Sequence, residues 1–383
     1  MAIQRNVDSE EAPIHGDILD TILTHVPLIH LLPASQVSRS WNGAVSTSLR
    51  GFNKPKPWLI LHTQNTRSPY PTTAHAFDPR SRVWVQIHKP EINYVSALRS
   101  AHSSLLYMLS PAKFSFSFDP LHHTWDHVDA PIMWRTDPIV GKVGKWVVIA
   151  GGTCDFEDDP LAVEMYDVES RTWRTCESMP AIFKDSAAST WLTIAVGSDR
   201  MYVAERSTGV GYTFDPDTAV WSGPYDVRPG GGGGGLCASS ALGIVNGRLV
   251  LVGLIGDGAN QKVKGLKLWE LDGETMECGR EIGELPAEFL KELEPDFAGL
   301  SSVNVNFKGD FLFVTNNSAP ERVIVGEFDD GGRCGWSSVR NSVVNDDVRL
   351  SSTVVYTCAD VGLGDLQRAT VSAGWRFSLK DGA

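Results

Sequence analysis

The chain has 383 residues, of which 42% are hydrophobic, so it can bury a substantial core and does not have the composition of a disordered protein. Its 46 acidic residues outnumber its 34 basic residues, and the net charge of −12 disfavours a general nucleic-acid binder, since such proteins carry a basic face. The longest apolar runs, such as Trp146–Ala150, are strand-sized and far short of the ~20 residues that cross a bilayer. We therefore expect neither a nucleic-acid partner nor a membrane partner.

The first 13 residues are polar and acidic, with no apolar segment and no Arg-rich amphipathic pattern. We expect residues 1–13 to be disordered and the protein to be cytoplasmic, nuclear or both. The six cysteines have no C-x-x-C spacing and no neighbouring histidine in a ligand pattern, so we expect scattered buried thiols, no metal and no cofactor.

From Ile14 to about Leu49 the apolar residues recur with a helical period. The first helical stripe contains Ile18, Leu19, Ile22, Leu23 and Val26, and Pro27 ends it. The second contains Ala34, Val37, Trp41, Ala44 and Val45, with Pro33 expected in its first turn. Two short helices are too small to bury both stripes on each other, so this segment needs a partner.

Residues 14–52 resemble the F-box. The family pattern combines an acidic residue, aliphatic pairs, a Leu-Pro pair and a final Arg-x-Trp. The matching residues are Ile14, Asp17, Ile18, Leu19, Ile22, Leu23, Val26, Pro27, Leu31, Leu32, Val37, Arg39 and Trp41. Two positions depart from the pattern: His15 replaces a proline and Ser38 replaces a cysteine. The resemblance implies that these residues form or support the surface that binds a Skp-type adaptor and, through it, a cullin-RING ubiquitin ligase.

An eight-residue segment then repeats along the chain. It reads F-D-P-R-S-R-V-W at Phe77–Trp84, and three further copies keep both the aromatic-Asp pair and the tryptophan. A fifth copy lacks the tryptophan and a sixth is one residue longer. The marker residues are Asp78, Trp84, Asp119, Trp125, Asp167, Trp173, Asp215, Trp221, Asp272, Asp329 and Trp336. The aspartates recur every 41–57 residues, which is the length of one four-stranded propeller blade.

Each copy has the chemistry of a hairpin turn. The carboxylate can accept hydrogen bonds from N–H groups of the turn, and the tryptophan begins the returning strand and packs between blades. A further strand precedes each hairpin, beginning at Trp58, Ser104, Trp146, Arg200, Arg248 and Phe311. No clear strand precedes Trp58, so we expect Thr353–Thr357 to supply the inner strand of the first blade and the last dozen residues to pair at its rim.

Strand, di-glycine, aromatic-Asp turn and tryptophan in this order resemble the kelch repeat, over residues 55–383. The predicted fold is an all-β six-bladed kelch β-propeller preceded by a small all-α F-box. The combination resembles plant-type F-box/kelch proteins, which implies a non-catalytic substrate receptor of a Skp–cullin–F-box ubiquitin ligase. The propeller loops would then capture a target protein for ubiquitination and proteasomal degradation. The resemblance points to a metabolic enzyme as target, such as one of phenylpropanoid or flavonoid synthesis.

Two alternatives remain at this point: a kelch scaffold without a ligase role, and a propeller enzyme. The residue sets of kelch-type copper oxidases and of sialidases are not recognisable in the sequence. We expect His122 and His123 to be solvated turn residues and the glycine run after Pro229 to be a connection, not a phosphate loop. The longer connections are the candidate target contacts, namely Cys154–Pro160, Met179–Ser186, Arg228–Leu236 and Leu285–Phe297. The last of these is expected to contain one helix that packs on the propeller.

Overall fold

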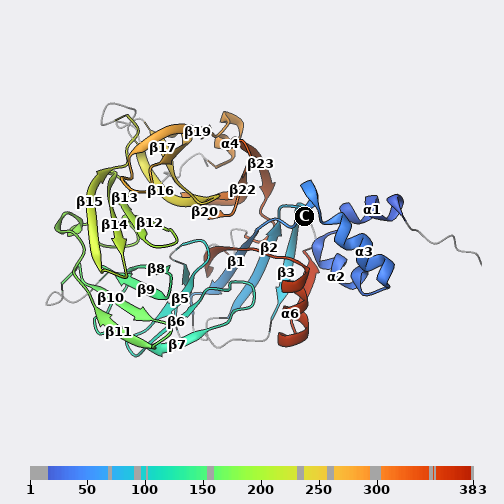
Figure 1. Cartoon of the computed structure of the whole chain (residues 1–383), viewed down its shortest axis with the longest axis horizontal. Helices are drawn as coiled ribbons and strands as arrows, with labels where there is room; N and C mark the ends of the chain where they lie inside the picture. The colour runs from blue at the N-terminus through green and yellow to red at the C-terminus, as the bar shows by residue number, and fades with distance from the viewer. Residues whose placement is uncertain are drawn as a thin grey trace, which may run out of the picture.

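A computed structural model of the whole chain describes residues 16–67, 71–89, 96–100, 102–152, 159–230, 237–256, 263–293, 303–344, 348 and 351–380. It consists of a small helical head and a ring of six β-sheets (Figure 1). Among these residues, no helix combines the length and the apolar character that spanning a membrane requires. Residues 1–13, predicted to be disordered, lie outside the described residues.

Three short helices make up the head: α1 (Asp17–Thr24), α2 (Leu28–Ser35) and α3 (Arg39–Ser48), followed by the 3-10 turn Gly51–Asn53. The prediction of two helices is therefore wrong. Pro33 lies inside α2 and not at the start of the second helix, since α2 begins directly after Pro27. The last helix begins at Ser38, whose hydroxyl accepts a hydrogen bond from the backbone N–H of Trp41 at 3.2 Å. An N-cap of this kind sets the helix start more strongly than the hydrophobic stripe does.

Five sheets of the ring have four antiparallel strands each, in sequence order, and the first sheet has five, with β24 as its innermost strand. The first sheet contains β24 (Ser352–Ala359), β1 (Trp58–Asn65), β2 (Thr72–Asp78), β3 (Val83–His88) and β25 (Arg376–Leu379). The second contains β4 (Arg99–Ser100), β5 (Leu106–Leu109), β6 (Lys113–Ser117) and β7 (Asp126–Asp129), and the third β8 (Ile139–Val143), β9 (Trp146–Ala150), β10 (Val163–Asp167) and β11 (Thr172–Thr175). The fourth contains β12 (Leu192–Val196), β13 (Met201–Glu205), β14 (Val210–Asp215) and β15 (Val220–Asp226). The fifth contains β16 (Cys237–Val245), β17 (Arg248–Gly256), β18 (Val263–Leu271) and β19 (Cys278–Glu284), and the sixth β20 (Val303–Lys308), β21 (Phe311–Asn316), β22 (Ala319–Phe328) and β23 (Cys334–Arg340).

The C-terminal part of the chain closes the ring, as predicted. β24 pairs antiparallel with β1 along its whole length, with Cys358 opposite Leu59, and so becomes the inner strand of the first sheet. β25 pairs with β3 at the outer rim, with Phe377 opposite Ile87. Between them lies a helix that the sequence analysis did not anticipate, α6 (Leu363–Ala373). Because both ends of the ring share one sheet, neither of its central strands is left as an open edge.

The six marker aspartates occupy equivalent turns, which confirms the repeat. Each lies at the end of the third strand of its sheet or one to two residues after it. In each case a carboxylate oxygen accepts a backbone N–H two to four residues later, at distances between 2.8 and 3.0 Å. The carboxylate thus organises the turn, which is the role that its position in the sequence suggested.

The marker tryptophans are less uniform than expected. Trp84 is buried, but Trp125, Trp173, Trp221 and Trp336 are half-buried. The expectation that these rings are enclosed between blades therefore holds fully for Trp84 alone. The reason is their position at the outermost strand, one side of which faces solvent. A similar correction applies to the thiols: of the cysteines whose side chains are described, Cys358 is buried and Cys176, Cys278 and Cys334 are half-buried.

Because the strands alternate in direction, the connections fall on two faces of the ring. One face, here called the short-turn face, carries the marker turns, such as 79–82 and 168–171. The opposite face, the long-loop face, carries the connections between sheets and those between second and third strands. Three of the four connections predicted to contact a target, after β11, β15 and β19, join one sheet to the next, and the one after β9 joins second and third strands. All four therefore belong to the long-loop face.

Candidate functional site

The head presents an apolar surface on α1 and at the start of α3. Ile18 is 69% exposed, Ile22 is 46% exposed and Val37 is 65% exposed, which is unusual for large aliphatic side chains. Ile18 and Ile22 are one helical turn apart, so both point away from the core on the same side of α1. This surface is open in the isolated chain.

The residues matched to the F-box pattern divide into three groups by burial. Leu19, Leu23 and Leu31 are buried; Val26, Pro27, Leu32 and Trp41 are half-buried; and Asp17, Ile18, Ile22, Val37 and Arg39 are exposed. Ile14 lies outside the described residues. The buried group shares one hydrophobic cluster with Leu28, Ile29 and Val45, so these side chains support the head and cannot contact a partner directly.

The head is packed against the propeller and does not stand alone. α2 contacts α6, and the cluster that contains the head's buried leucines also contains Leu366, Ala369 and Trp375 from the C-terminal segment. Figure 1 shows the three head helices outside the ring, beside the first sheet and α6. The support that two short helices were expected to need thus comes in part from the same chain.

Arg80, in the first marker turn, fastens α1 to the ring. Its guanidinium donates to the backbone carbonyls of Val26 at 2.9 Å, Thr24 at 3.2 Å, Leu23 at 3.3 Å and Asn53 at 3.2 Å. The C-terminal carbonyls of a helix have no partners within the helix and carry a partial negative charge, which a cation satisfies. A repeat residue that the sequence analysis treated as part of a turn is therefore also the C-terminal cap of the first head helix.

On the long-loop face, apolar side chains gather on the connections that flank the third sheet. Ile132 (77% exposed) and Trp134 lie between β7 and β8, while Ile182 and Trp191 (57% exposed) lie between β11 and β12. The two connections are joined by hydrogen bonds to Asp137: the Ser189 N–H donates to its backbone carbonyl at 2.9 Å, and the Thr190 hydroxyl to its carboxylate at 2.6 Å. These four exposed residues, on two connections that share hydrogen bonds, are here called the apolar rim. Of the four, Ile182 alone lies in a connection predicted to contact a target, Met179–Ser186. Ile132, Trp134 and Trp191 were not identified from sequence, because exposure of single residues in a loop leaves no periodic signal.

A buried ion pair holds the apolar rim in shape. The Arg135 guanidinium lies 2.9 Å from the Glu164 carboxylate, and neither side chain is appreciably exposed. Glu164 also accepts the backbone N–H of Ile132 at 2.7 Å, and Arg135 also donates to the carbonyls of Gly151 and Ala162. A buried charge is tolerated when it is paired and hydrogen-bonded, as the Arg135 and Glu164 side chains are here. The connection that presents Ile132 and Trp134 is thus fixed by the third sheet itself.

The histidine pair of the second turn is not solvated, which corrects the sequence interpretation. His123 is buried, with its ring centroid 4.9 Å from that of His62 and 5.7 Å from that of Trp375. His122 bonds to the Asp119 carboxylate at 2.7 Å and to the carbonyl of Asp365 in α6 at 2.9 Å. The turn is covered by the C-terminal segment, which is distant in sequence. Among the described residues, no group of histidine, cysteine and acidic side chains has the arrangement of a metal site.

The remaining predicted target contacts are described only in part. Residues 153–158, 231–236 and 294–302 lie outside the described residues, and with them most of the connections after β9, β15 and β19. The helix predicted after Leu285 is present as α4 (Ala287–Leu293). Leu285, Leu290 and Leu293 are buried and Phe289 packs against the same cluster, so this helix lies on the propeller as expected.

Comparisons with known proteins agree with this architecture. The F-box domain family matches residues 16–53. F-box/kelch-repeat protein At1g23390 of Arabidopsis thaliana is 41% identical over 377 residues, which cover 94% of this chain and 93% of that protein. Kelch repeat and BTB domain-containing protein 8 of Danio rerio is 22% identical over 169 residues, 40% of this chain and 28% of that protein.

Among solved structures, a Bacteroides fragilis protein described as a 6-phosphogluconolactonase has a TM-score of 0.41 and 12% identity, covering 81% of this chain and all of that one, a likeness too weak to support any conclusion. The Arabidopsis relative is similar along almost the whole chain, in the head and in the ring alike. The chain therefore belongs to the family of F-box/kelch-repeat proteins.

Proposed function

We propose that this chain is the substrate-receptor subunit of a Skp–cullin–F-box ubiquitin ligase: the head binds the Skp-type adaptor and the propeller captures a target protein. The observation that carries the first half is the exposed apolar surface of Ile18, Ile22 and Val37 on a segment that matches the F-box. Its mechanism is proximity, because holding target and ligase together raises the effective concentration of the target's lysines near the ubiquitin-conjugating enzyme.

The long-loop face is the proposed target-binding surface. It carries the apolar rim, and exposed tryptophans in well-positioned loops are typical anchors of protein interfaces. The head is fastened to a turn of the short-turn face, by Arg80, so adaptor binding leaves the opposite face free. The finer proposal, that the target is a metabolic enzyme such as one of phenylpropanoid or flavonoid synthesis, rests on the likeness to plant-type family members.

The adaptor half is tested by the double substitution Ile18→Asp and Ile22→Asp in the full chain. Both side chains are exposed, so the fold should persist, while two buried carboxylates at an apolar interface should abolish capture of the Skp-type adaptor. Thr47→Asp, an exposed change on α3, is the control. Undiminished adaptor capture by the double variant, with circular dichroism unchanged, would exclude this surface.

The target half is tested by affinity purification with the proteasome inhibited, followed by mass spectrometry. The intact chain should co-purify both adaptor and target, and the Ile18→Asp/Ile22→Asp variant should keep the target and lose the adaptor. That variant should also protect the target from degradation by competition. Conversely, Ile132→Ser with Trp191→Ser should lose the target and keep the adaptor. A chain whose head variants change no protein's half-life would favour the scaffold alternative.

A further inference from the structure

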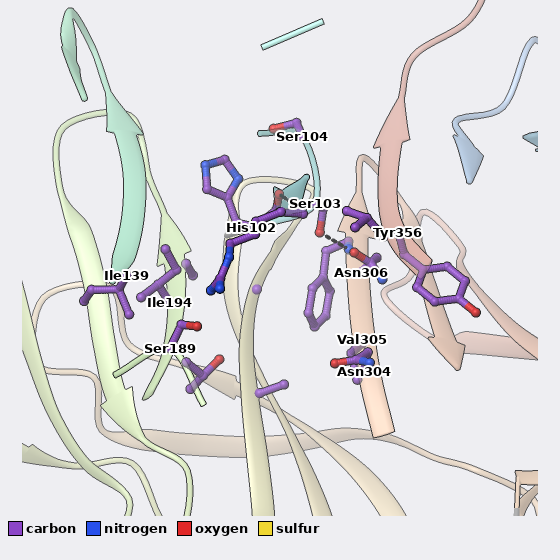
Figure 2. Close-up of a pocket in the computed structure, with 18 of the residues that line it drawn as sticks. His102, Ser103, Ser104, Ile139, Ser189, Ile194, Asn304, Val305, Asn306 and Tyr356 are labelled. Carbon is purple, nitrogen blue, oxygen red and sulfur yellow. Dashed lines mark hydrogen bonds between the residues drawn. The ribbon is translucent and has the colours of Figure 1, made fainter. Parts of the chain in front are cut away.

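A cavity of about 1000 Å³ runs along the axis of the propeller. It is lined mainly by the innermost strands, so that residues from β8 and β12 face residues from β20 across it. Figure 2 shows Ile139 and Ile194 on one side and Asn304, Val305 and Asn306 on the other. Its volume lies at the upper end of the range of small-molecule sites.

The charge of the lining is opposite to that of the protein. The described residues that line the cavity include four cations, Arg99, Lys142, Arg206 and Lys308, and no aspartate or glutamate. In the chain as a whole the 46 acidic residues outnumber the 34 basic ones, so the lining has the opposite balance of charge. A cavity with walls of one sign focuses the electrostatic field and attracts ligands of the other sign.

The cations occupy both ends of the cavity. Lys142 and Lys308 lie at the ends of β8 and β20, toward the short-turn face, and Lys308 pairs with Asp360 at 3.1 Å. Arg99 begins β4 and Arg206 directly follows β13, both toward the long-loop face. Arg99 lies 3.4 Å from the Asp137 carboxylate, which leaves Arg206 as the cation of that end whose charge is least compensated.

Arg206 makes hydrogen bonds to uncharged groups. Its guanidinium donates to the carbonyl of Leu192 at 3.1 Å and to that of Ser240 at 3.2 Å. Burial lowers the pKa of this guanidinium, and no carboxylate of the described part of the chain opposes that shift. Arg206 is half-buried, and an arginine keeps its proton when it is partly desolvated, so an approaching anion stabilises its charge.

An apolar belt lies beside Arg206. The Arg206 guanidinium donates to Leu192 and Ser240, and the apolar residues Ile194 and Leu242 lie two positions after these acceptors. The hydroxyl of Thr193 accepts the Leu242 N–H at 2.8 Å, which joins the two strands. Val355 from β24 and Val305 from β20, the strand beside β16, also line the cavity. Hydroxyl and amide groups, among them Thr193 and Asn304, add uncharged polar groups to the wall. The belt provides for an apolar ligand body and Arg206 for an anionic group.

We propose that the axial cavity binds a small organic anion, with its phosphate or carboxylate group against Arg206 and its apolar body against the belt of Ile194, Leu242, Val305 and Val355. This site is independent of the F-box head and of the target's identity. We favour a small molecule over an inserted acidic segment of a partner, because cations lie at both ends of the cavity and apolar side chains line its wall as well. An acidic segment would contact only the mouth.

The test uses isothermal titration calorimetry on the full chain with four probes: 1-naphthyl phosphate, 1-naphthoate, 1-naphthol and inorganic phosphate. Either or both naphthyl anions should bind at least about ten-fold more tightly than 1-naphthol and than inorganic phosphate, since a charged hydrogen bond and apolar burial both contribute. The comparison of 1-naphthyl phosphate with 1-naphthoate distinguishes the two kinds of anion. Equal affinity for 1-naphthol would overturn the anion site, and equal affinity for inorganic phosphate would overturn the apolar half.

Two variants locate the binding. Arg206→Gln removes the cation and should weaken the naphthyl anion by about ten-fold or more. Asn304→Asp introduces a carboxylate of the same size into the lining and should also weaken binding of the naphthyl anion by about ten-fold or more. This second variant tests the site independently if Arg206→Gln folds poorly. Asn42→Asp, exposed on α3, adds the same charge far from the cavity and should leave affinity unchanged. If Asn304→Asp left the affinity for the naphthyl anion unchanged, the anion would bind outside this cavity. If Asn42→Asp weakened binding as much as Asn304→Asp, the effect would come from the net charge of the protein and not from the cavity.

Discussion

Trp84 joins the first and sixth sheets of the ring. Its ring centroid lies 5.4 Å from that of Phe77, and its indole N–H donates to the Arg340 carbonyl at 2.8 Å. Because the side chain is almost fully buried, Trp84→Ala should lower the free energy of unfolding by about 3–5 kcal/mol. Urea denaturation measures this. Trp191→Ala, at an exposed tryptophan, is the matched control and should cost about 0.5 kcal/mol or less.

Residue types in the repeat could be predicted from the sequence, but their burial could not. The carboxylate of each marker aspartate acts within its own turn, so a local pattern suffices to assign it. The burial of a tryptophan depends on the neighbouring sheet and on its distance from the rim, which the repeat does not encode. His123 shows the same limit: a turn histidine is solvated by default, but here the rings of His62 and Trp375, both distant in sequence, cover it.

The buried histidines should make stability depend on pH. Lys89 lies 3.2 Å from His123, and burial, reinforced by this neighbouring cation, lowers the pKa of both His62 and His123 well below 6.5. The folded protein therefore keeps both rings neutral where the unfolded chain binds protons. The unfolded state binds more protons below about pH 6.5, so stability is lost as pH falls from there toward the folded-state pKa values.

The variant His123→Asn tests how much His123 alone contributes to this pH dependence. Asparagine cannot titrate and tolerates the positive φ of 49° at this position. Between about pH 6 and pH 5, the unfolding free energy of the variant should depend less steeply on pH than that of the parent, by up to about 1.4 kcal/mol per pH unit. Parallel pH profiles of parent and variant in urea titrations would mean that His123 is not neutral in the folded state.

Among the elements, α6 links the two halves of the molecule. Its buried face contacts the head through Leu366 and Ala369, while the flanking strands β24 and β25 belong to the first sheet. β24 could be predicted from a hydrophobic run, and the pairing at the rim from its position in the chain, but α6 could not be predicted. The contact joins α2 to a segment more than 300 residues later, and no local period reports such a pairing.

Arg80 offers a direct test of the coupling between head and propeller. Arg80→Ala removes four hydrogen bonds from a cation to carbonyls at the end of α1 and the head, so the head should open more readily, by about 1.5–3 kcal/mol. Hydrogen exchange should show lower protection in α1 while the central strands keep theirs. Arg82→Ala, in the same turn but exposed and bonded to Ser338 alone, is the control. Equal loss of protection in both variants would contradict the specific role of Arg80.

At the scale of the whole molecule, the ring and the head depend on the same C-terminal segment. The sequence predicted six repeats correctly because each repeat encodes its own hairpin. It predicted closure because the first repeat lacks an inner strand. The axial cavity could not be predicted, since its lining comes from the least distinctive strands of the repeats and becomes a common surface only once the ring is closed.

Two truncated chains should distinguish the role of β24, which closes the ring, from that of β25, which pairs at its outer rim. A chain ended after Leu350 lacks both β24 and α6, so β1 becomes an open edge and the head loses part of its core. We expect this chain to aggregate on size-exclusion chromatography and to unfold without a cooperative transition. A chain ended after Trp375 lacks only β25 at the rim. It should remain monomeric and unfold cooperatively at a moderately lower temperature. If the shorter chain were as soluble and cooperative as the longer one, the ring would close without its C-terminal strand, and the dependence of both halves on this segment would be refuted.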